Sequence, residues 1–176
     1  MGFVMGYDLY TESTKEDIPE EDRYFRWNIW GWSPILTLAS SCGWEPEGTM
    51  IPKLSEAEAR KHNVSDAERV RHNEFADSWE GDYFGNDGQL VTETDAFNMA
   101  KALESALDDL PDQPIPVPGE NEDGTVSLVD ENNVRHRNSM AQGNLSSLLV
   151  NFSGKENKDY IRKFIAFLRL GSYSIN

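Results

Sequence analysis

The chain has 176 residues, with 31 Asp and Glu against 16 Lys and Arg, which gives a formal net charge of −15. This length fits one domain with a substantial core, and the charge disfavours direct binding to nucleic acid phosphates or to anionic membranes. Hydrophobic residues make up 38% of the chain, and no apolar run is long enough to span a bilayer, so we expect a folded, soluble protein.

The acidic residues are concentrated in residues 74–131, which we call the acidic block. It holds sixteen acidic residues and one basic residue, Lys101, so its net charge equals that of the whole chain. The segment from residue 132 onward is basic, with seven Lys or Arg against Glu156 and Asp159. The sequence alone leaves open whether folding brings this basic segment against the acidic block.

Two strands are predicted near the N-terminus. Residues 4–10 are typical of a short strand, and a polar, acidic loop follows them. Over residues 24–32, alternation places Phe25, Trp27 and Ile29 on one face of a second strand. We therefore expect an aromatic strand that buries one of its faces.

A helix is predicted to follow this strand. Ser33 is a good N-cap residue, and Pro34 suits the first helical position because proline lacks the N–H that would be unpaired there. Apolar residues continue to Gly43, which we expect to act as the C-cap.

Two Ser-x-x-Glu patterns predict a pair of short polar helices over residues 56–62 and 66–79, each opened by a capping box. The second helix is expected to bury its apolar residues, Val70, Phe75 and Trp79. The Asn-Asp-Gly sequence at 86–88 then predicts a turn between short strands.

The remaining pattern predicts a long helix, a loop and a final helix. Apolar residues every three or four positions predict a helix over 95–110. Residues 111–124 hold four of the eight prolines and predict a flexible loop, and 125–129 suit a strand. A third capping box at Ser153 is expected to open the last helix, with an edge strand at 173–175.

These elements predict one α+β domain spanning residues 1–176. We expect a single compact domain with three main helices plus short helices packed on a small, mostly antiparallel sheet. The Pro- and acid-rich loop at 111–124 is its flexible part. The only cysteine, Cys42, excludes an intrachain disulfide, so a cytoplasmic location is the simplest expectation.

One motif resembles a known sequence family. Residues 24–36 are Tyr-Phe-Arg-Trp-Asn-Ile-Trp-Gly-Trp-Ser-Pro-Ile-Leu, and Phe-Ile-Ala-Phe-Leu-Arg stands at 164–169. Together they resemble a family of small uncharacterised bacterial and phage proteins with the approximate motif Tyr-Phe-Arg-x-Asn-x-Trp-x-Trp-x-Pro-Leu. The match covers residues 24–44, 83–110 and 160–175. The resemblance implies a bacterial or phage origin and carries no activity, cofactor or site residue.

The aromatic motif allows two interpretations. Its rings are expected to form a core between the strand and the following helix. The alternative is a small-ligand site, in which rings stack on a sugar or base and polar side chains supply hydrogen bonds. The residues of that alternative site are Arg26, Asn28, Trp30 and Trp32.

No catalytic, metal or cofactor motif emerges from the sequence, so we predict none of these and lean against an enzyme. The three histidines lack zinc-ligand spacing, and the Asn-Asp-Gly loop lacks the acidic residues of a calcium loop. Cys42 is expected to be a buried, unreactive thiol. Glycosidase-type carboxylate pairs stay open, because sequence spacing does not give their separation in space.

The acidic block has a plain interpretation as a solvated face and a sharper one as a binding surface. On the sharper interpretation the protein is a non-enzymatic binding or inhibitor protein acting on a basic protein partner. A phage-encoded anti-host-defence factor presenting a nucleic-acid-mimicking acidic face is one form of it, and a ligand binder or enzyme with a cleft beside the Trp-rich motif is the alternative. The candidate partner-binding residues are Asp82, Asp87, Glu93, Glu104, Asp108, Asp109 and Asp112.

Overall fold

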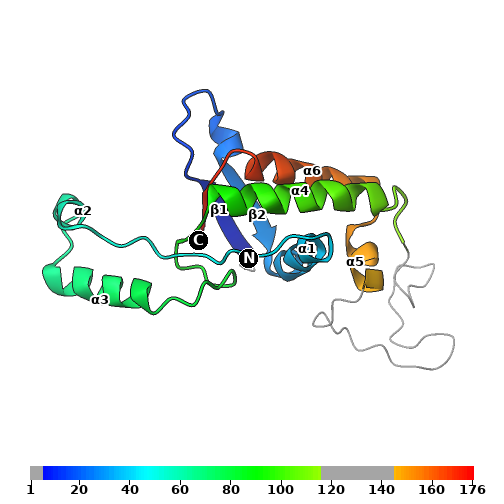
Figure 1. The fold of residues 1–176 in the computed structure, drawn as a ribbon. Helices are drawn as coiled ribbons and strands as arrows, with labels where there is room; N and C mark the ends of the chain where they lie inside the picture. Colours follow the sequence, from blue (N-terminus) through cyan, green and yellow to red (C-terminus); the bar gives the residue numbers. More distant parts are fainter. Residues whose placement is uncertain (1–5, 116–144) are drawn as a thin grey trace, which may run out of the picture.

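The computed structural model describes residues 6–115 and 145–176, which form helices and a small sheet (Figure 1). The elements in chain order are β1 (Gly6–Thr11), η1 (Glu20–Arg23), β2 (Tyr24–Asn28), α1 (Ile29–Ser41), α2 (Glu56–Lys61), α3 (Asp66–Asp77), β3 (Gln89–Val91), α4 (Glu93–Asp109), α5 (Leu145–Phe152), α6 (Lys155–Leu168) and β4 (Tyr173–Ile175). The predicted α+β class, with helices packed on a small antiparallel sheet, is confirmed.

The four-stranded sheet has the order β2-β1-β4-β3, and every neighbouring pair is antiparallel. The expectation that residues 173–175 form an edge strand is wrong. Ile175 pairs with Leu9 of β1 on one side and with Gln89 of β3 on the other. The last strand therefore joins the two halves of the sheet, and its Tyr173 and Ile175 are fully buried.

Helices cover one face of the sheet. α1 and α6 contact the strands, and α4 packs against both helices. Alternation sends Tyr7 and Leu9 of β1 into this helical layer, where they are buried, while Asp8 and Tyr10 lie on the opposite face. The core is aromatic, and Trp32 and Phe164 are both completely buried in it.

The start of α1 differs from the prediction. The helix begins at Ile29, because the side chain of Asn28 caps it by accepting a hydrogen bond from Gly31 N at 2.7 Å. A Cβ atom on Gly31 would lie 2.8 Å from the ring of Trp27, so glycine allows the helix to turn directly off the strand. Pro34 therefore lies inside the helix, and Ile29 is helical.

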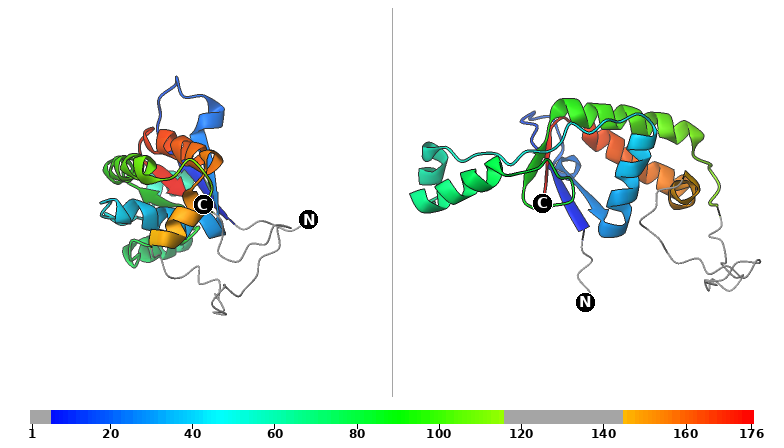
Figure 2. Two further views of the ribbon diagram at one scale, coloured as in Figure 1. Left: turned by 90° about the vertical axis from the view of Figure 1, so that its right-hand side faces the viewer. Right: turned by 60° about the horizontal axis from the view of Figure 1, so that its bottom comes forward.

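The two predicted polar helices are present, and both capping boxes form, at Ser55 and at Ser65. They lie apart from the sheet and its covering helices (Figure 1; Figure 2, right). We call residues 51–79, which contain α2 and α3, the arm. The expected burial of apolar residues in α3 is wrong, since Val70 is 45% exposed and Phe75 is 43% exposed.

We expect the amide hydrogens of α2 and α3 to exchange with solvent much faster than those of α4 and α6. α3 buries no residue and α2 buries only Ala59, so little packing opposes local opening. Hydrogen exchange followed by mass spectrometry checks this. A Ser65→Ala variant should speed exchange further in α3 alone, because losing the cap costs about 1 kcal/mol. Equal protection of α3 and α6 would contradict the expectation.

Helical spacing predicts a buried apolar stripe on the last helix, made of Tyr160, Ile161, Phe164, Ile165, Phe167 and Leu168. Ile161, Phe164 and Leu168 are fully buried, whereas Tyr160 is 41% exposed. The predicted capping box is wrong: Gly154 is the N-cap, and the hydroxyl of Ser153 accepts a hydrogen bond from Ile115 N instead. Only residues 111–115 of the predicted loop at 111–124 are described. The rest of that loop and the predicted strand at 125–129 lie outside the described residues.

Candidate functional site

The polar residues of the aromatic motif both lie on β2, and each has its own structural partner. Arg26 forms an ion pair with Asp8 at 3.4 Å on the face of the sheet that helices do not cover. The side chain of Asn28 is the N-cap of α1, bound to Gly31 N. Each side chain thus has a role in the fold, and Arg26 remains 45% exposed.

The two tryptophans of the alternative ligand site also lie in different surroundings. Trp32 is completely buried, and its Nε1 donates a hydrogen bond to the carbonyl of Tyr83 at 2.8 Å. Trp30 is 65% exposed on the first turn of α1. Trp32 therefore belongs to the core, whereas Trp30 is open to solvent.

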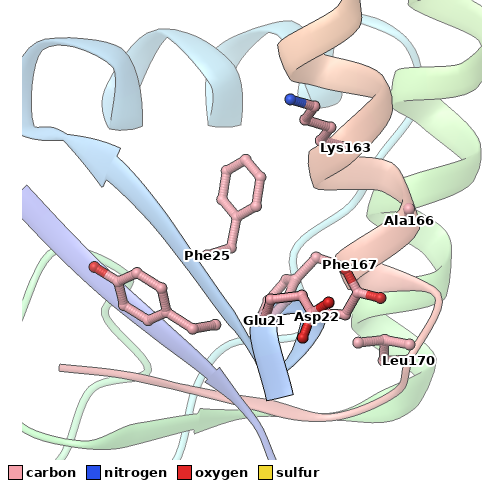
Figure 3. Close-up of a pocket in the computed structure, with 8 residues that line it drawn as sticks. Glu21, Asp22, Phe25, Lys163, Ala166, Phe167 and Leu170 are labelled. Atoms are coloured by element: carbon pink, nitrogen blue, oxygen red, sulfur yellow. The ribbon is translucent and has the colours of Figure 1, made fainter. Parts of the chain in front are cut away.

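A cavity of about 460 Å³ lies beside β2, between η1 and α6 (Figure 3). None of the four residues of the alternative ligand site lines it. We call it the β2 groove. Its lining residues are Glu21, Asp22, Tyr24, Phe25, Lys163, Ala166, Phe167 and Leu170.

The seven candidate acidic residues lie before β3, on α4 and just after α4, and two of them are paired with basic residues. Asp82 and Asp87 precede β3, and Asp112 follows α4. The other four lie on α4 itself, which at 17 residues is about 25 Å long. These four are Glu93, Glu104, Asp108 and Asp109.

The basic C-terminal segment neutralises part of the acidic block. Arg169 pairs with Glu104 at 2.7 Å, and Lys158 pairs with Asp112 at 2.6 Å. Lys158 is nearly buried and also donates a hydrogen bond to the carbonyl of Leu110. The hydrogen bond and positive charge of Lys158 lower the pKa of Asp112. The packing of α6 on α4 therefore partly offsets the acidic charge on and just after α4.

The acidic charge persists where the arm joins the domain, in residues 44–50 and 80–93, which we call the acidic neck. These two segments contain no Lys or Arg. The neck combines three residues of the predicted set with three that the prediction did not include. Its exposed acidic residues are Glu45, Glu47, Glu80, Asp82, Asp87 and Glu93.

Backbone contacts hold the two neck segments together. Thr49 N donates to Gly81 O at 3.2 Å, and Thr49 Oγ1 donates to Asp82 O at 2.5 Å. Gly48 and Gly81 both have positive φ, and a Cβ atom on Gly81 would lie 3.4 Å from the Cα of Gly48. Glycine at these positions lets the segments approach closely. Glu45 and Glu47 thus join acidic residues more than thirty positions away, which sequence patterns do not reveal.

Exposed apolar side chains accompany the acidic residues. On the neck, Met50 is 49% exposed and Phe84 is 53% exposed. On the arm, Val70 and Phe75 of α3 are also exposed. Exposed aromatic residues and methionine are enriched in protein–protein interfaces relative to other surfaces.

A buried carboxylate fixes the neck to the domain. Asp95 is completely buried. Its Oδ1 accepts hydrogen bonds from Trp44 Nε1 at 2.7 Å and from Glu47 N at 3.3 Å, while its Oδ2 accepts one from Tyr83 OH at 2.5 Å. Trp44, Glu47 and Tyr83 all belong to the neck. The sequence suggested for Asp95 only a place at the start of a helix.

Burial sets the protonation of this cluster. Desolvation raises the pKa of Asp95, although the hydrogen bonds from Tyr83 and Trp44 favour its charged form. Desolvation and the neighbouring Asp95 also raise the pKa of Tyr83. The phenol of Tyr83 therefore stays protonated at neutral pH and can donate to the carboxylate.

Neither a metal site nor a membrane span is found in the parts of the chain that the structure describes. Within residues 6–115 and 145–176, no three His, Cys, Asp or Glu side chains are arranged to hold a metal ion. Over the same ranges, no helix is both long and apolar enough to cross a bilayer.

Comparison with known proteins finds no match among family models, curated proteins or solved structures. The resemblance of residues 24–36 to a bacterial and phage family stays a prediction.

Proposed function

We propose that this protein is a non-enzymatic binding protein whose acidic neck docks a partner protein with a basic surface. The observation that carries the proposal is the pairing of two distant segments, both without Lys or Arg, into one region with six exposed carboxylates. Such a region speeds encounter with a basic partner and selects against acidic ones.

Apolar contacts would supply the short-range part of this binding. Met50 and Phe84 are exposed among the neck acids, and Val70 and Phe75 are exposed on the neighbouring arm. Surface charges mostly set rate and specificity, whereas buried apolar anchors supply most of the affinity. The partner surface is thus basic with apolar pockets.

A nucleic-acid-mimicking inhibitor is the narrower form of this proposal. It requires carboxylates that are free to contact basic residues of a nucleic-acid channel. Glu104 and Asp112 are paired with Arg169 and Lys158, so the neck and the remaining acids of α4 would carry the mimicry. A phage-encoded inhibitor of a cytoplasmic host protein fits this form.

The alternative function, a small-ligand site built on the Trp-rich motif, has less support. Arg26, Asn28 and Trp32 are held by separate partners, and the exposed Trp30 lies outside the β2 groove. We therefore favour the protein-binding function.

We expect a triple neck variant, Glu45→Lys, Glu80→Lys and Asp87→Lys, to lose its partner. The test is affinity capture from a bacterial lysate, followed by titration of the identified partner with each purified protein. Reversing three neck charges should weaken binding at least about tenfold, and raising salt should weaken the wild-type complex, because screening shortens the range of surface charge.

The matched control carries the same change in net charge elsewhere. Glu12, Glu16 and Asp17 are exposed in the loop between β1 and η1, and replacing all three with lysine leaves the neck intact. This control should keep its partner. Equal loss of binding in both variants would show that only net charge matters and would refute the neck as the docking site.

A further inference from the structure

A second surface surrounds β2, which is one of the two edge strands of the sheet. Exposed large apolar side chains gather near this strand and are distinct from those of the arm and neck. They come from β1, β2, the start of α1 and the first half of α6. These residues are Tyr10, Tyr24, Ile29, Trp30 and Tyr160.

The backbone of β2 directs part of its hydrogen-bonding capacity outward. Asp8 exchanges both backbone hydrogen bonds with Asn176, so the alternate residues of β1, Tyr7 and Leu9, direct theirs toward β2. Phe25 pairs with Leu9 in this register, and the backbone N–H and C=O of Tyr24 consequently point away from β1. The outward carbonyl of Arg26 accepts a hydrogen bond from Tyr160 OH, so this edge offers an extended segment the backbone groups of Tyr24.

The β2 groove runs along the same edge. Figure 3 shows Phe25 between β2 and α6 and Ala166 on α6, with Lys163 toward one end of the groove and the carboxylates of Glu21 and Asp22 toward the other; Phe167 also lines it. The groove therefore has an apolar floor and a charged group at each end. A strand edge beside a helix-walled groove is the arrangement that binds extended peptides by strand addition.

Charge decides which kind of segment fits. A second copy of this chain would bring another −15 to the surface, so self-association is opposed by repulsion. Around Glu21 and Asp22, residues 11–23 hold six acidic residues against Lys15 and Arg23. A basic side chain is favoured at that end of the groove.

We propose that the β2 groove binds an extended peptide segment of another protein, with an apolar side chain on the floor and a Lys or Arg at Glu21 and Asp22. Side chains two positions apart in a strand face the same way and lie about 7 Å apart. An apolar residue and a Lys or Arg at this spacing would contact the groove floor and the carboxylates of Glu21 and Asp22 at the same time. This site is separate from the acidic neck and does not depend on the function proposed there.

The test uses a short fluorescent peptide with one Leu, a Lys two positions later and Thr elsewhere. Its binding to the full chain is followed by fluorescence anisotropy, beside peptides carrying Leu→Ala or Lys→Glu. The parent peptide should bind saturably, and each change should weaken binding at least about tenfold. Chemical-shift changes in NMR spectra should centre on Tyr24, Phe25 and residues 163–170. No saturable binding of the parent peptide would overturn the proposal.

Two variants localise the binding. Ala166 is exposed on α6, and Ala166→Trp should fill the groove and abolish peptide binding. Ala57, which is also exposed but lies on α2, provides the matched control, since Ala57→Trp should leave binding unchanged. Thermal unfolding shows whether both variants fold. Wild-type affinity in a folded Ala166→Trp protein would overturn the proposal.

A charge reversal tests the basic end without altering the groove floor. The double variant Glu21→Lys, Asp22→Lys should weaken binding of the Lys peptide and strengthen binding of the Glu peptide, because the reversed charges repel lysine and attract glutamate. Both replaced side chains are exposed. The triple neck variant should bind the Lys peptide like the wild type. The site would be refuted if the neck variant lost peptide binding, or if the double variant still preferred the Lys peptide to the Glu peptide.

Discussion

Replacing Trp32 with alanine is expected to lower the free energy of unfolding by about 4 kcal/mol. Trp32 is completely buried, its ring stacks on Tyr7 at 5.3 Å between centroids, and it meets Phe164 edge-on. Its Nε1 also donates a buried hydrogen bond to the carbonyl of Tyr83, and in the variant that carbonyl would have lost its donor. Because domains of this size are stable by about 5–15 kcal/mol, the variant should be close to unfolding. Urea denaturation measures the change.

Trp30 offers a close control, since it is the same residue type on the same helix but is 65% exposed. Trp30→Ala should change stability by less than about 0.5 kcal/mol. A Trp32→Phe variant keeps the ring contact and removes the hydrogen bond, so it should lose about 1–2 kcal/mol. Similar losses at positions 30 and 32 would contradict the burial of Trp32 in the core.

Replacing Asp95 with alanine is expected to lower the free energy of unfolding by about 3 kcal/mol. The change removes the acceptor for Trp44 Nε1, Tyr83 OH and Glu47 N at once. Since these donors belong to the neck, amide exchange there should also speed up. Asp109 is exposed on the same helix, and Asp109→Ala should change stability by less than about 0.5 kcal/mol.

The pH dependence of an Asp95→Asn variant tests the protonation of this carboxyl group. Burial raises the pKa of Asp95 in the folded protein above its ordinary value of about 3.9. The folded state therefore binds more protons than the unfolded state between these two pKa values, and this contribution to stability is lost as pH rises through the folded pKa. The stability advantage of the wild type over Asp95→Asn should shrink as pH rises. An advantage that grows with pH would mean that the hydrogen bonds lower the pKa instead.

Local patterns predicted the elements whose stabilising groups lie close together in the chain. The capping boxes at Ser55 and Ser65 use groups three residues apart, and both form. The apolar stripe of α6 likewise follows helical spacing. One prediction failed locally, since Asn28 and not Ser33 caps α1. Others failed because of the tertiary structure. Ser153 binds Ile115 N instead of capping α6, and Val70 of α3 meets no core because the arm lies apart from it.

The candidate sites were only partly predictable for the same reason. Asp82, Asp87 and Glu93 belong to an acidic run that is visible in the sequence. Glu45 and Glu47 reach the neck through backbone contacts such as Thr49 N to Gly81 O, which no short-range pattern encodes. The β2 groove combines residues 21–25 with residues 163–170, and composition gives no sign that these two segments meet.

The central place of β4 has a consequence for the order of folding during synthesis. The hairpin of β1 and β2 can form once about thirty residues have emerged from the ribosome, as both partners are local. β3 has no strand partner until residues 173–175 arrive, since β4 stands between it and β1. While the chain is still growing, β1 and β3 therefore expose backbone edges that nothing pairs, and nascent chains are at risk of joining one another there. Synthesis of the final strand ends that exposure by closing the sheet.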